Sequence, residues 1–300
     1  MFDQYRSIEL IGAGGVADVY KVEDIWSGTI YARKALRRVD ADSLIRFRRE
    51  KDFYVEQRSN RHIIGIVDWN LDGPQPYLIL PYSELGSLQQ FVTNRQPWQR
   101  VVQWFCDVAV GLAPVFHVNG FHGDPKPSNL LLFQNQDGTD LVLVTDFGFG
   151  QRPNLLSVPM TRSPRGTPEY MDPDLRNGAP YTWRHDMHAL GRSMRELLTG
   201  CRDKSIFSFM PGPPALAQLI DSMTDPEPQK RPDIDMVYQT LRDLINVPMR
   251  MPVQTKQGSG SGWWWLLGAA AVAYATANSY DDGVQRFRDS DGRFRGGRWR

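Results

Sequence analysis

Three polar residues in the middle of the chain have the types and spacing that phosphoryl transfer requires. Asp124 and Asn129 lie in one short stretch, and Asp146 follows the apolar run Leu141–Val144. Transfer of a phosphoryl group from a nucleotide needs a base near the attacking hydroxyl, oxygen ligands for Mg²⁺ and cations on the phosphates. Asp124 could act as the base, and Asn129 and Asp146 could act as the metal ligands.

The segments that carry these residues are His122-Gly123-Asp124-Pro125-Lys126-Pro127-Ser128-Asn129 and Asp146-Phe147-Gly148. They resemble the protein kinase family, whose catalytic loop reads H-R-D-x-K-x-x-N ahead of D-F-G. The resemblance implies that Lys126 neutralises the γ-phosphate and that His122 has a structural role, bonding the backbone and packing near Phe147. Gly123 departs from the pattern, because the family usually has Arg at this position.

A glycine-rich segment near the N-terminus is similar to the kinase loop G-x-G-x-x-G-x-V. It reads Gly12-Ala13-Gly14-Gly15-Val16-Ala17-Asp18-Val19. Glycines let a hairpin backbone close over phosphates without side-chain collisions, so that its N–H groups can donate to them. Ala17 replaces the third glycine, a small change. Taken alone, the segment fits an ordinary hairpin turn about equally well, whereas a dinucleotide-binding loop is disfavoured because a strand follows it.

The next predicted strand contains Tyr31-Ala32-Arg33-Lys34 and resembles the kinase V-A-I-K strand. Strand periodicity places Ala32 and Lys34 on one face, so that Ala32 would lie against adenine while Lys34 reaches the α- and β-phosphates. The family also needs a helix Glu to hold this Lys. We expect Glu50 in that role, with Glu56 on the same predicted helix as the fallback.

The segment Tyr77–Leu88 looks like the last strand of a kinase N-lobe running into the hinge. In this register Leu80 is the gatekeeper, and the Pro81 carbonyl and the Ser83 N–H would face adenine. Proline has no N–H, but the first hinge position is needed only as an acceptor. The resemblance also places Leu131 among the ATP-binding residues.

A later segment resembles the G-T-P-E-Y-M-A-P-E close of a kinase activation segment. It reads Gly166-Thr167-Pro168-Glu169-Tyr170-Met171-Asp172-Pro173-Asp174. Thr167 together with Lys126 is typical of serine/threonine kinases. The resemblance predicts an ion pair between Asp174, which replaces the usual Glu, and Arg231. It also identifies Asp186 as the helix acid that braces the backbone of the catalytic loop.

The resemblance covers roughly residues 5–246 and implies a signalling serine/threonine protein kinase that transfers the γ-phosphate of ATP to Ser/Thr hydroxyls of protein substrates. Mg²⁺ is the expected metal, with Mn²⁺ as the alternative. Small-molecule kinases of the aminoglycoside or choline type often have H-G-D as here, but they usually carry His instead of Lys126 and lack G-T-P-E-Y. A catalytically inactive scaffold commonly loses the strand Lys, the catalytic Asp or the metal Asp, all of which this chain retains.

Gly123 also bears on regulation. In the kinases that the chain resembles, the Arg at this position joins a basic pocket that grips a phosphorylated activation loop. Glycine offers no donor, so we expect activity without activation-loop phosphorylation. The loop contains two candidate acceptors, Thr161 and Ser163, and the neighbouring Arg162 and Arg165 could order the segment by pairing with acidic residues instead.

Hydrophobic patterning indicates the elements that would position these residues. Strand-like alternation predicts strands at 8–22 (broken by the glycine turn), 29–36, 63–69 and 76–82. Helical patterns predict helices at 42–57, 99–119, 183–199, 214–224 and 234–245. The predicted fold class is α+β, a two-lobed protein kinase fold with a small β-rich N-lobe and a larger helical C-lobe. Its predicted limits are about 1–80 for the N-lobe, 81–87 for the hinge and 88–247 for the C-lobe.

The composition fits a soluble globular protein, and a cytoplasmic location is expected for the kinase domain that the motifs resemble. Of the 300 residues, 41% are apolar and 23% are charged, near the averages for soluble proteins, so a sizeable core is expected. The formal net charge of +1 gives no indication of a nucleic-acid partner. Only Cys106 and Cys201 occur, far apart, which fits a reducing compartment and argues against disulfides or a zinc site. The first residues lack a signal-peptide pattern.

The composition changes abruptly at Pro248. Residues 248–262 look like a flexible linker, 263–280 form a short apolar segment that begins with three tryptophans, and 281–300 are rich in Arg, Gly and Asp. The apolar run is shorter than the roughly 20 residues that a bilayer span needs. Its tryptophans suit a membrane interface. We expect shallow membrane association or a docking helix; the alternative is a tail helix packed on the kinase domain or on another copy.

Overall fold

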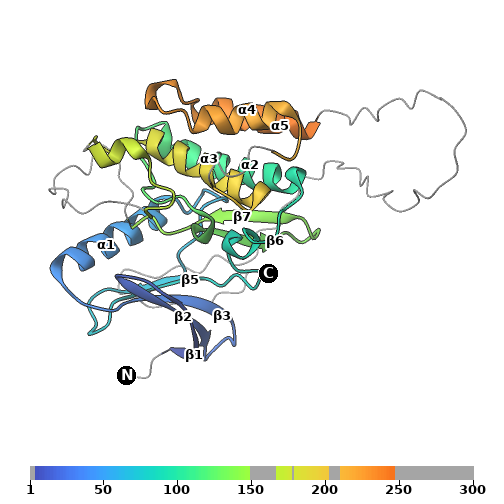
Figure 1. Cartoon of the computed structure of the whole chain (residues 1–300). Coiled ribbons are helices and arrows are strands. Elements are labelled where there is room, and N and C mark those ends of the chain that lie inside the picture. The colour runs from blue at the N-terminus through green and yellow to red at the C-terminus, as the bar shows by residue number, and fades with distance from the viewer. Residues whose placement is uncertain (1–3, 149–166, 178, 203–209, 247–300) are drawn as a thin grey trace, which may run out of the picture. The chain divides into compact units, whose positions relative to one another are not determined.

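The computed structural model describes residues 4–148, 167–177, 179–202 and 210–246. These residues form a β-rich N-terminal part and a helical C-terminal part (Figure 1). The predicted linker (248–262), apolar segment (263–280) and tail (281–300) lie outside the described residues and remain sequence predictions.

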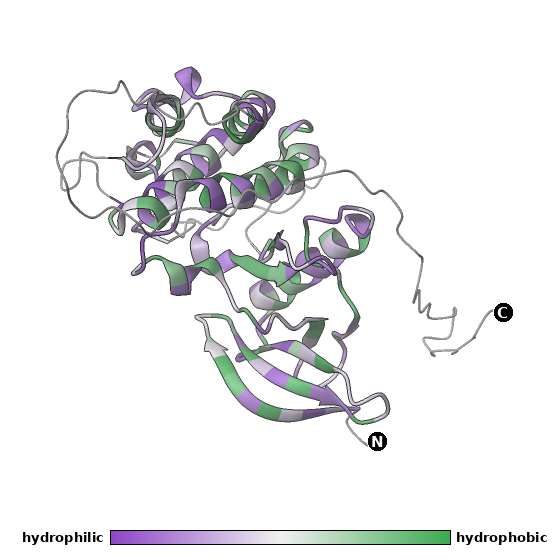
Figure 2. Cartoon of the chain, turned by 90° about the vertical axis from the view of Figure 1, so that its right-hand side faces the viewer, coloured by the Kyte–Doolittle hydropathy of each residue, from purple (hydrophilic) through white to green (hydrophobic). Residues whose placement is uncertain are grey.

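The N-terminal part is built on a five-stranded antiparallel sheet. Its strands are β1 (Tyr5–Ala13), β2 (Ala17–Asp24), β3 (Ile30–Leu36), β4 (Asp68–Asn70) and β5 (Tyr77–Pro81), in the order β1-β2-β3-β5-β4. Hydrophilic and hydrophobic residues alternate along the long strands (Figure 2), as expected for a sheet with two unlike faces. The predicted strand 8–22 is thus two strands joined by the glycine turn.

One helix accompanies this sheet. Helix α1 (Ala41–Glu56) begins after Asp40, whose side chain accepts a hydrogen bond from the Ser43 N–H at 2.8 Å and so caps the first turn. Phe47, Glu50 and Tyr54 are its buried residues. Their spacing of three and four places them on one face, so this single face carries both apolar packing and a carboxylate into the interior.

The C-terminal part contains the long helices and a small second sheet. The helices are α2 (Trp98–Phe116), α3 (Trp183–Thr199), α4 (Pro214–Met223) and α5 (Ile234–Asn246), and the hairpin consists of β6 (Leu130–Gln134) and β7 (Asp140–Val144). Helix α2 packs against α5 and β7, and α3 packs against α4 and α2. The four helices match the predicted ranges within a few residues, because each carries a continuous apolar face.

The predicted strand at 63–69 is mostly wrong, and the reason lies in its hydrogen-bond partners. Only Asp68–Asn70 form the strand β4. The N–H of Ile64 donates to the Val144 carbonyl at 3.0 Å, and the Val144 N–H donates to the His62 carbonyl at 2.9 Å. Buried apolar residues here therefore join the two parts of the molecule instead of extending the N-terminal sheet.

One apolar core runs through both parts. Its buried members include Leu36 and Leu78 from the sheet, Phe147 at the junction, and Trp104 and Leu112 from α2. Within the described ranges, no helix combines the length and apolar character needed to cross a bilayer.

Candidate active site

The glycine-rich turn lies beside the strand lysine because of the sheet register. Val19 on β2 pairs with Gly12 on β1 and with Lys34 on β3, so the three residues stand in one row across the sheet. A Cβ on Gly14 would lie 2.8 Å from the Ala17 carbonyl oxygen, which is too close for any side chain. The tight turn from Ala13 to Ala17 therefore requires glycine at position 14.

Lys34 is the centre of a charge cluster drawn from three distant segments. Its Nζ donates to both carboxylate oxygens of Glu50, at 2.7 and 2.8 Å, and to Oδ1 of Asp146 at 2.8 Å. The predicted pairing of Lys34 with Glu50 is thus present, and Glu56 is exposed. Strand β3, helix α1 and the segment after β7 each supply one charge.

Burial and charge act in opposite directions on this cluster. Burial raises the pKa of Glu50, while Lys34 lowers it, and the balance leaves the pKa raised. For Asp146, desolvation also raises the pKa, but Lys34 lowers it more, so its pKa lies below the ordinary value. Burial alone would lower the pKa of Lys34, whereas Asp146 and Glu50 raise it, and the raised value keeps the amine charged.

The backbone at Asp146 has an unusual conformation. Its φ of 65° lies in the left-handed region, which is costly for a residue other than glycine. Asp146 donates its N–H to the Tyr54 hydroxyl at 2.9 Å, in addition to its side-chain bond with Lys34. Contacts on both its backbone and its side chain therefore hold this conformation. The sequence reasoning missed Tyr54, although it follows Glu50 by one helical turn.

The predicted hinge residues lie at the end of β5 and directly after it. Leu80 is buried and pairs with Ala32 of β3, and Pro81 is the last residue of β5. The Ser83 hydroxyl donates to the Leu132 carbonyl of β6, which ties this segment to the C-terminal part. Leu131 lies next along β6 and forms a bridge with Ser87. These pairings therefore place Ala32 beside the start of the hinge segment and Leu131 beside its end.

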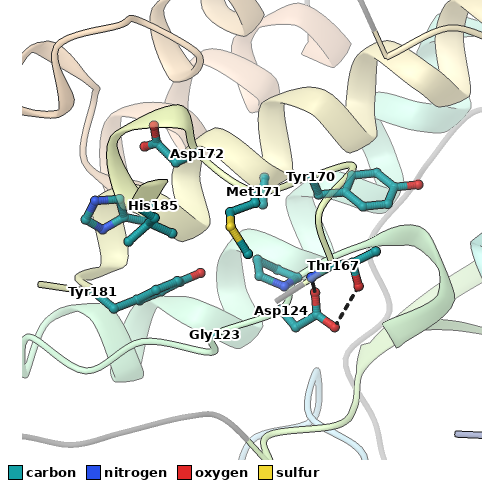
Figure 3. A pocket seen from close by; sticks show the side chains of 11 residues that line it. Gly123, Asp124, Thr167, Tyr170, Met171, Asp172, Tyr181 and His185 are labelled. Atoms are coloured by element: carbon teal, nitrogen blue, oxygen red, sulfur yellow. Dashed lines mark hydrogen bonds between the residues drawn. The ribbon is translucent and has the colours of Figure 1, made fainter. Parts of the chain in front are cut away.

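The catalytic-loop acid is fixed by contacts to both of its oxygens. The Thr167 N–H donates to Oδ1 of Asp124 at 2.8 Å and its hydroxyl donates to Oδ2 at 3.1 Å (Figure 3). Lys126 lies 2.7 Å from Oδ2 and also donates to the Thr167 hydroxyl. Asp124, Lys126 and Thr167 thus form a closed set that joins the catalytic loop to the end of the activation segment.

Asn129 and Asp146 have the chemistry of a magnesium pair. The Asn129 amide nitrogen donates to the Asp124 carbonyl at 2.8 Å, which leaves the amide oxygen available to a metal. Mg²⁺ is usually held by one or two carboxylates together with substrate phosphates and waters. Among the described residues no group of three or more His, Cys, Asp or Glu could form a metal cage. One amide oxygen and one carboxylate suit a metal that also binds substrate phosphates.

His122 is held as a neutral structural residue. Its Nδ1 accepts the Asp124 N–H at 3.1 Å, and its Nε2 lies 2.9 Å from the Thr145 carbonyl, which can only accept. Nε2 must therefore carry the proton and Nδ1 must be bare. Burial lowers the pKa of His122, in agreement with this neutral form. Its ring also packs on Phe147, with centroids 4.4 Å apart, as predicted.

Asp186 braces the catalytic loop from α3. Its carboxylate accepts the His122 N–H at 2.6 Å, the Gly123 N–H at 3.0 Å and the Tyr181 hydroxyl at 2.6 Å. The two loop contacts are those the resemblance predicted; Tyr181 was not foreseen. Gly123 has a φ of 94°, in the left-handed region that favours glycine. Burial raises the pKa of Asp186 to about 7, against the opposing effect of its three donors.

The predicted ion pair between Asp174 and Arg231 is wrong. Arg231 instead pairs with Asp172, and both side chains are fully buried. Asp174 is the second residue of the short helix Pro173–Asn177, donates its N–H to Oδ1 of Asp172 and lies 3.6 Å from His185. The turn thus directs Asp172 inward and leaves Asp174 partly exposed. Although burial raises the pKa of Asp172, Arg231 lowers it further.

A small pocket lies beside Asp124. Figure 3 shows Gly123, Asp124, Thr167, Met171, Tyr181 and His185 around it. Gly123 contributes only backbone to its wall. The predicted phosphate acceptors Thr161 and Ser163, with Arg162 and Arg165, lie outside the described residues, so the structure does not address the switch.

Comparison with known proteins agrees with this arrangement. The family model described as "Protein kinase domain" matches residues 5–208. The chain is 32% identical over 205 residues to the "probable serine/threonine-protein kinase PknB" of Lactococcus lactis, covering 66% of this chain and 32% of the relative. It is 29% identical over 202 residues to "serine/threonine-protein kinase PrkC" of Bacillus subtilis, covering 66% and 30%.

A third relative is "serine/threonine-protein kinase PknB" of Mycobacterium leprae, 29% identical over 209 residues, covering 66% of this chain and 33% of the relative. The chain therefore spans about a third of the length of the curated relatives it matches. The two-part α+β fold and the family match confirm the predicted kinase fold. On this evidence, the chain belongs to the protein kinase domain family.

Proposed function

We propose that this chain is a serine/threonine protein kinase that uses ATP and a divalent metal. The observation that carries the proposal is the simultaneous presence of two ordered clusters. Lys34 is bonded to both Glu50 and Asp146, while Asp124 is held by Thr167 and Lys126. The relatives, all named as serine/threonine kinases, support the same activity.

The residues suggest a division of tasks during transfer. Lys34, fixed by Glu50, would hold the α- and β-phosphates of ATP under the glycine turn. Asp124 would orient the substrate hydroxyl and accept its proton, because its two oxygens are already fixed in direction by Thr167 and Lys126. Lys126 would then neutralise charge on the transferring γ-phosphoryl group.

Asn129 and Asp146 would hold the metal. Bound Mg²⁺ supplies charge neutralisation at the β- and γ-phosphates. Lys34 occupies Oδ1 of Asp146, so the lysine and the metal would share this carboxylate. The lowered pKa of Asp146 keeps the carboxylate ionised and available as a ligand at neutral pH.

The activity is tested by incubating the purified full chain with γ-labelled ATP, Mg²⁺ and a serine- and threonine-containing acceptor protein. Asp124→Asn removes the base but retains the size of the side chain, and we expect transfer to fall by about a thousandfold. Asp72→Asn is the matched control, because the Asp72 side chain is 92% exposed and lies outside the site. Asp72→Asn should transfer label at the wild-type rate.

The location of the label separates the alternatives. Label on Ser or Thr supports the proposal. Label that appears only on an added aminoglycoside or choline would indicate a small-molecule kinase. No transfer to any acceptor by wild-type protein, with retained ATP binding, would indicate an inactive scaffold.

Activity should not depend on phosphorylation of the activation loop. The support is Gly123, which provides no side-chain donor for a phosphate, together with Asp186, which already fixes the loop backbone through two N–H groups. We expect the Thr161→Ala, Ser163→Ala double variant to keep its turnover within about tenfold, equivalent to roughly 1.4 kcal/mol of barrier. A larger drop would identify this loop as a phosphate switch.

The segment 263–280 is proposed to bind a membrane surface. Its apolar composition and its three tryptophans support this proposal, as argued from the sequence. Full-length protein should co-sediment with phospholipid vesicles, and protein truncated at Gly258 should not. Equal sedimentation of the two forms would contradict the proposal.

A further inference from the structure

One buried hydroxyl is bonded to two of the three members of the Lys34 cluster, Glu50 and Asp146. Tyr54 lies on the inward face of α1, and its side chain is completely buried. Its hydroxyl donates to Oε1 of Glu50 at 3.1 Å, accepts the Asp146 N–H at 2.9 Å and lies 3.3 Å from the Thr145 hydroxyl. A buried hydroxyl must be hydrogen-bonded, and here its bonds go to Glu50 and to the segment after β7.

Counting donors and acceptors fixes the direction of these bonds. A tyrosine hydroxyl has one proton and two lone pairs. Its proton goes to the Glu50 carboxylate, which can only accept while ionised. One lone pair takes the Asp146 N–H, so the Thr145 hydroxyl must be the donor to the other. The oxygen of Tyr54 is therefore fully used. One of its bonds stays within α1, to Glu50, and the other two reach the segment after β7.

We propose that Tyr54 is a positioning residue, whose hydroxyl joins Glu50 to the backbone of Asp146 and thereby holds both carboxylates on Lys34. This inference rests on the proposed kinase function. The geometry explains why a helix residue and a loop residue, distant in sequence, approach the same amine together. It also provides a support for the left-handed backbone of Asp146.

The aromatic ring of Tyr54 has a separate, apolar role. It makes edge contacts with Phe53 at 6.3 Å and with Phe147 at 6.2 Å between centroids, and Phe53 stacks on Phe147 at 4.0 Å. Tyr54→Phe retains these ring contacts and removes only the oxygen. The substitution therefore separates positioning from packing.

A matched control exists in the same part of the molecule. Tyr5 on β1 is also buried, donates its hydroxyl to Oδ2 of Asp68 at 3.0 Å and makes edge contacts with Tyr31 and Tyr77. It belongs to a separate small apolar cluster, away from Lys34. Tyr5→Phe removes an equivalent carboxylate-bonded hydroxyl from a site with no proposed part in transfer.

The first measurement is turnover as a function of pH in the full chain. The ionisable groups around the hydroxyl are Lys34 from β3, Glu50 from α1 and Asp146 after β7, with His122 packed on the neighbouring Phe147. Loss of the Tyr54 donor makes the ionised form of Glu50 less favourable, so its proton binds at higher pH. We expect Tyr54→Phe to lower kcat/KM at least about tenfold at neutral pH. The acid limb of its pH profile should also shift to higher pH.

The second measurement does not depend on activity. The rate of acetylation of Lys34 by acetic anhydride, followed by mass spectrometry, reports how firmly the amine is held. We expect Tyr54→Phe to raise this rate at least about threefold, because the Lys34 contacts weaken. Thr145→Val, which removes one donor and leaves the other two bonds, should raise it less. Tyr5→Phe should leave both the acetylation rate and the pH limb as in wild type.

The outcomes are distinct. A higher Lys34 reactivity together with an upward acid limb in Tyr54→Phe, and neither in Tyr5→Phe, supports the inference. Unchanged Lys34 reactivity in Tyr54→Phe overturns it, as does reduced turnover with an unmoved limb, which would indicate packing alone. Wild-type protein without transfer would contradict the proposed function, and Lys34 reactivity would still decide the role of Tyr54.

Discussion

The Lys34 cluster and the Asp124 cluster are held in different ways. The first joins side chains from β3, α1 and the segment after β7, and its members meet only where the two parts of the molecule come together. The second lies wholly within the C-terminal part, where backbone N–H groups of His122 and Gly123 are anchored on Asp186. Asp124 should therefore stay in place under conditions that separate Lys34 from its partners.

This difference suggests where each cluster is vulnerable. Long-range side-chain contacts between parts of a protein are lost by small local openings, whereas backbone contacts inside a packed core open only with larger unfolding. The Lys34 cluster should therefore be disrupted more easily than the Asp124 cluster.

The largest expected effect comes from removing the cation of the first cluster. Lys34→Met leaves Glu50 and Asp146 facing one another without a counter-charge. We expect kcat to fall about a hundredfold to a thousandfold, because a positioned charge on the phosphates is lost. Steady-state kinetics with γ-labelled ATP checks this, and the fold should be retained in circular dichroism. A less than tenfold loss would mean that Lys34 does not act on the phosphates.

The second prediction concerns stability in the C-terminal part. Asp172→Ala leaves Arg231 buried without its partner, which should cost about 3–5 kcal/mol in the free energy of unfolding. Asp174→Ala removes a partly exposed carboxylate and should cost less than about 0.5 kcal/mol. Urea unfolding measures both. Equal losses of stability in the two variants, or a larger loss in Asp174→Ala, would contradict the ion pair between Asp172 and Arg231.

The third prediction extends that pair to pH. The pKa of Asp172 is lower in the folded chain than in the unfolded chain, so its stabilising effect is present above the unfolded pKa and lost as pH falls through the folded value. The stability difference between wild type and Asp172→Asn should therefore shrink as the solution is acidified below pH 4 or so. A constant difference across that range would contradict an ionised Asp172.

The fourth and smallest prediction concerns the acid limb of activity. Because its pKa is raised, Glu50 takes up a proton at a higher pH than an ordinary Glu does. Lys34 then loses a charged partner as the solution is acidified. His122, in contrast, stays neutral because its pKa is lowered. The acid limb of the pH profile of kcat/KM should shift in Glu50→Gln and should stay as in wild type in Asp72→Asn. A limb that is unaffected by Glu50→Gln would assign the titration to another group.

The residues that sequence predicted well are those whose partners are set by periodicity or by local pattern. The resemblance to protein kinases gave Glu50 and Asp186 their predicted roles, and strand periodicity placed Lys34 on the same face as Ala32. The long helices were predicted because each carries a continuous apolar face.

The residues that sequence predicted poorly depend on turns and on long-range contacts. Asp172 and Asp174 are both acidic and lie two positions apart, so the pattern could not show which one the turn directs toward Arg231. Tyr54 resembled an ordinary apolar residue of an amphipathic helix. Its spacing of one turn from Glu50 was a usable signal, but the Asp146 N–H that it contacts comes from a segment 92 residues further along the chain.

The most direct test of the account is transfer by Asp146→Ala, because Asp146 belongs to the Lys34 cluster and is also the proposed metal ligand. Wild type, Asp146→Ala and Asp72→Asn would be incubated with γ-labelled ATP, Mg²⁺ and an acceptor protein, and phosphoamino acids would be separated. The account predicts label on serine or threonine with wild type and Asp72→Asn, and a loss of about a thousandfold with Asp146→Ala. Phosphorylation by Asp146→Ala at the wild-type rate would contradict it.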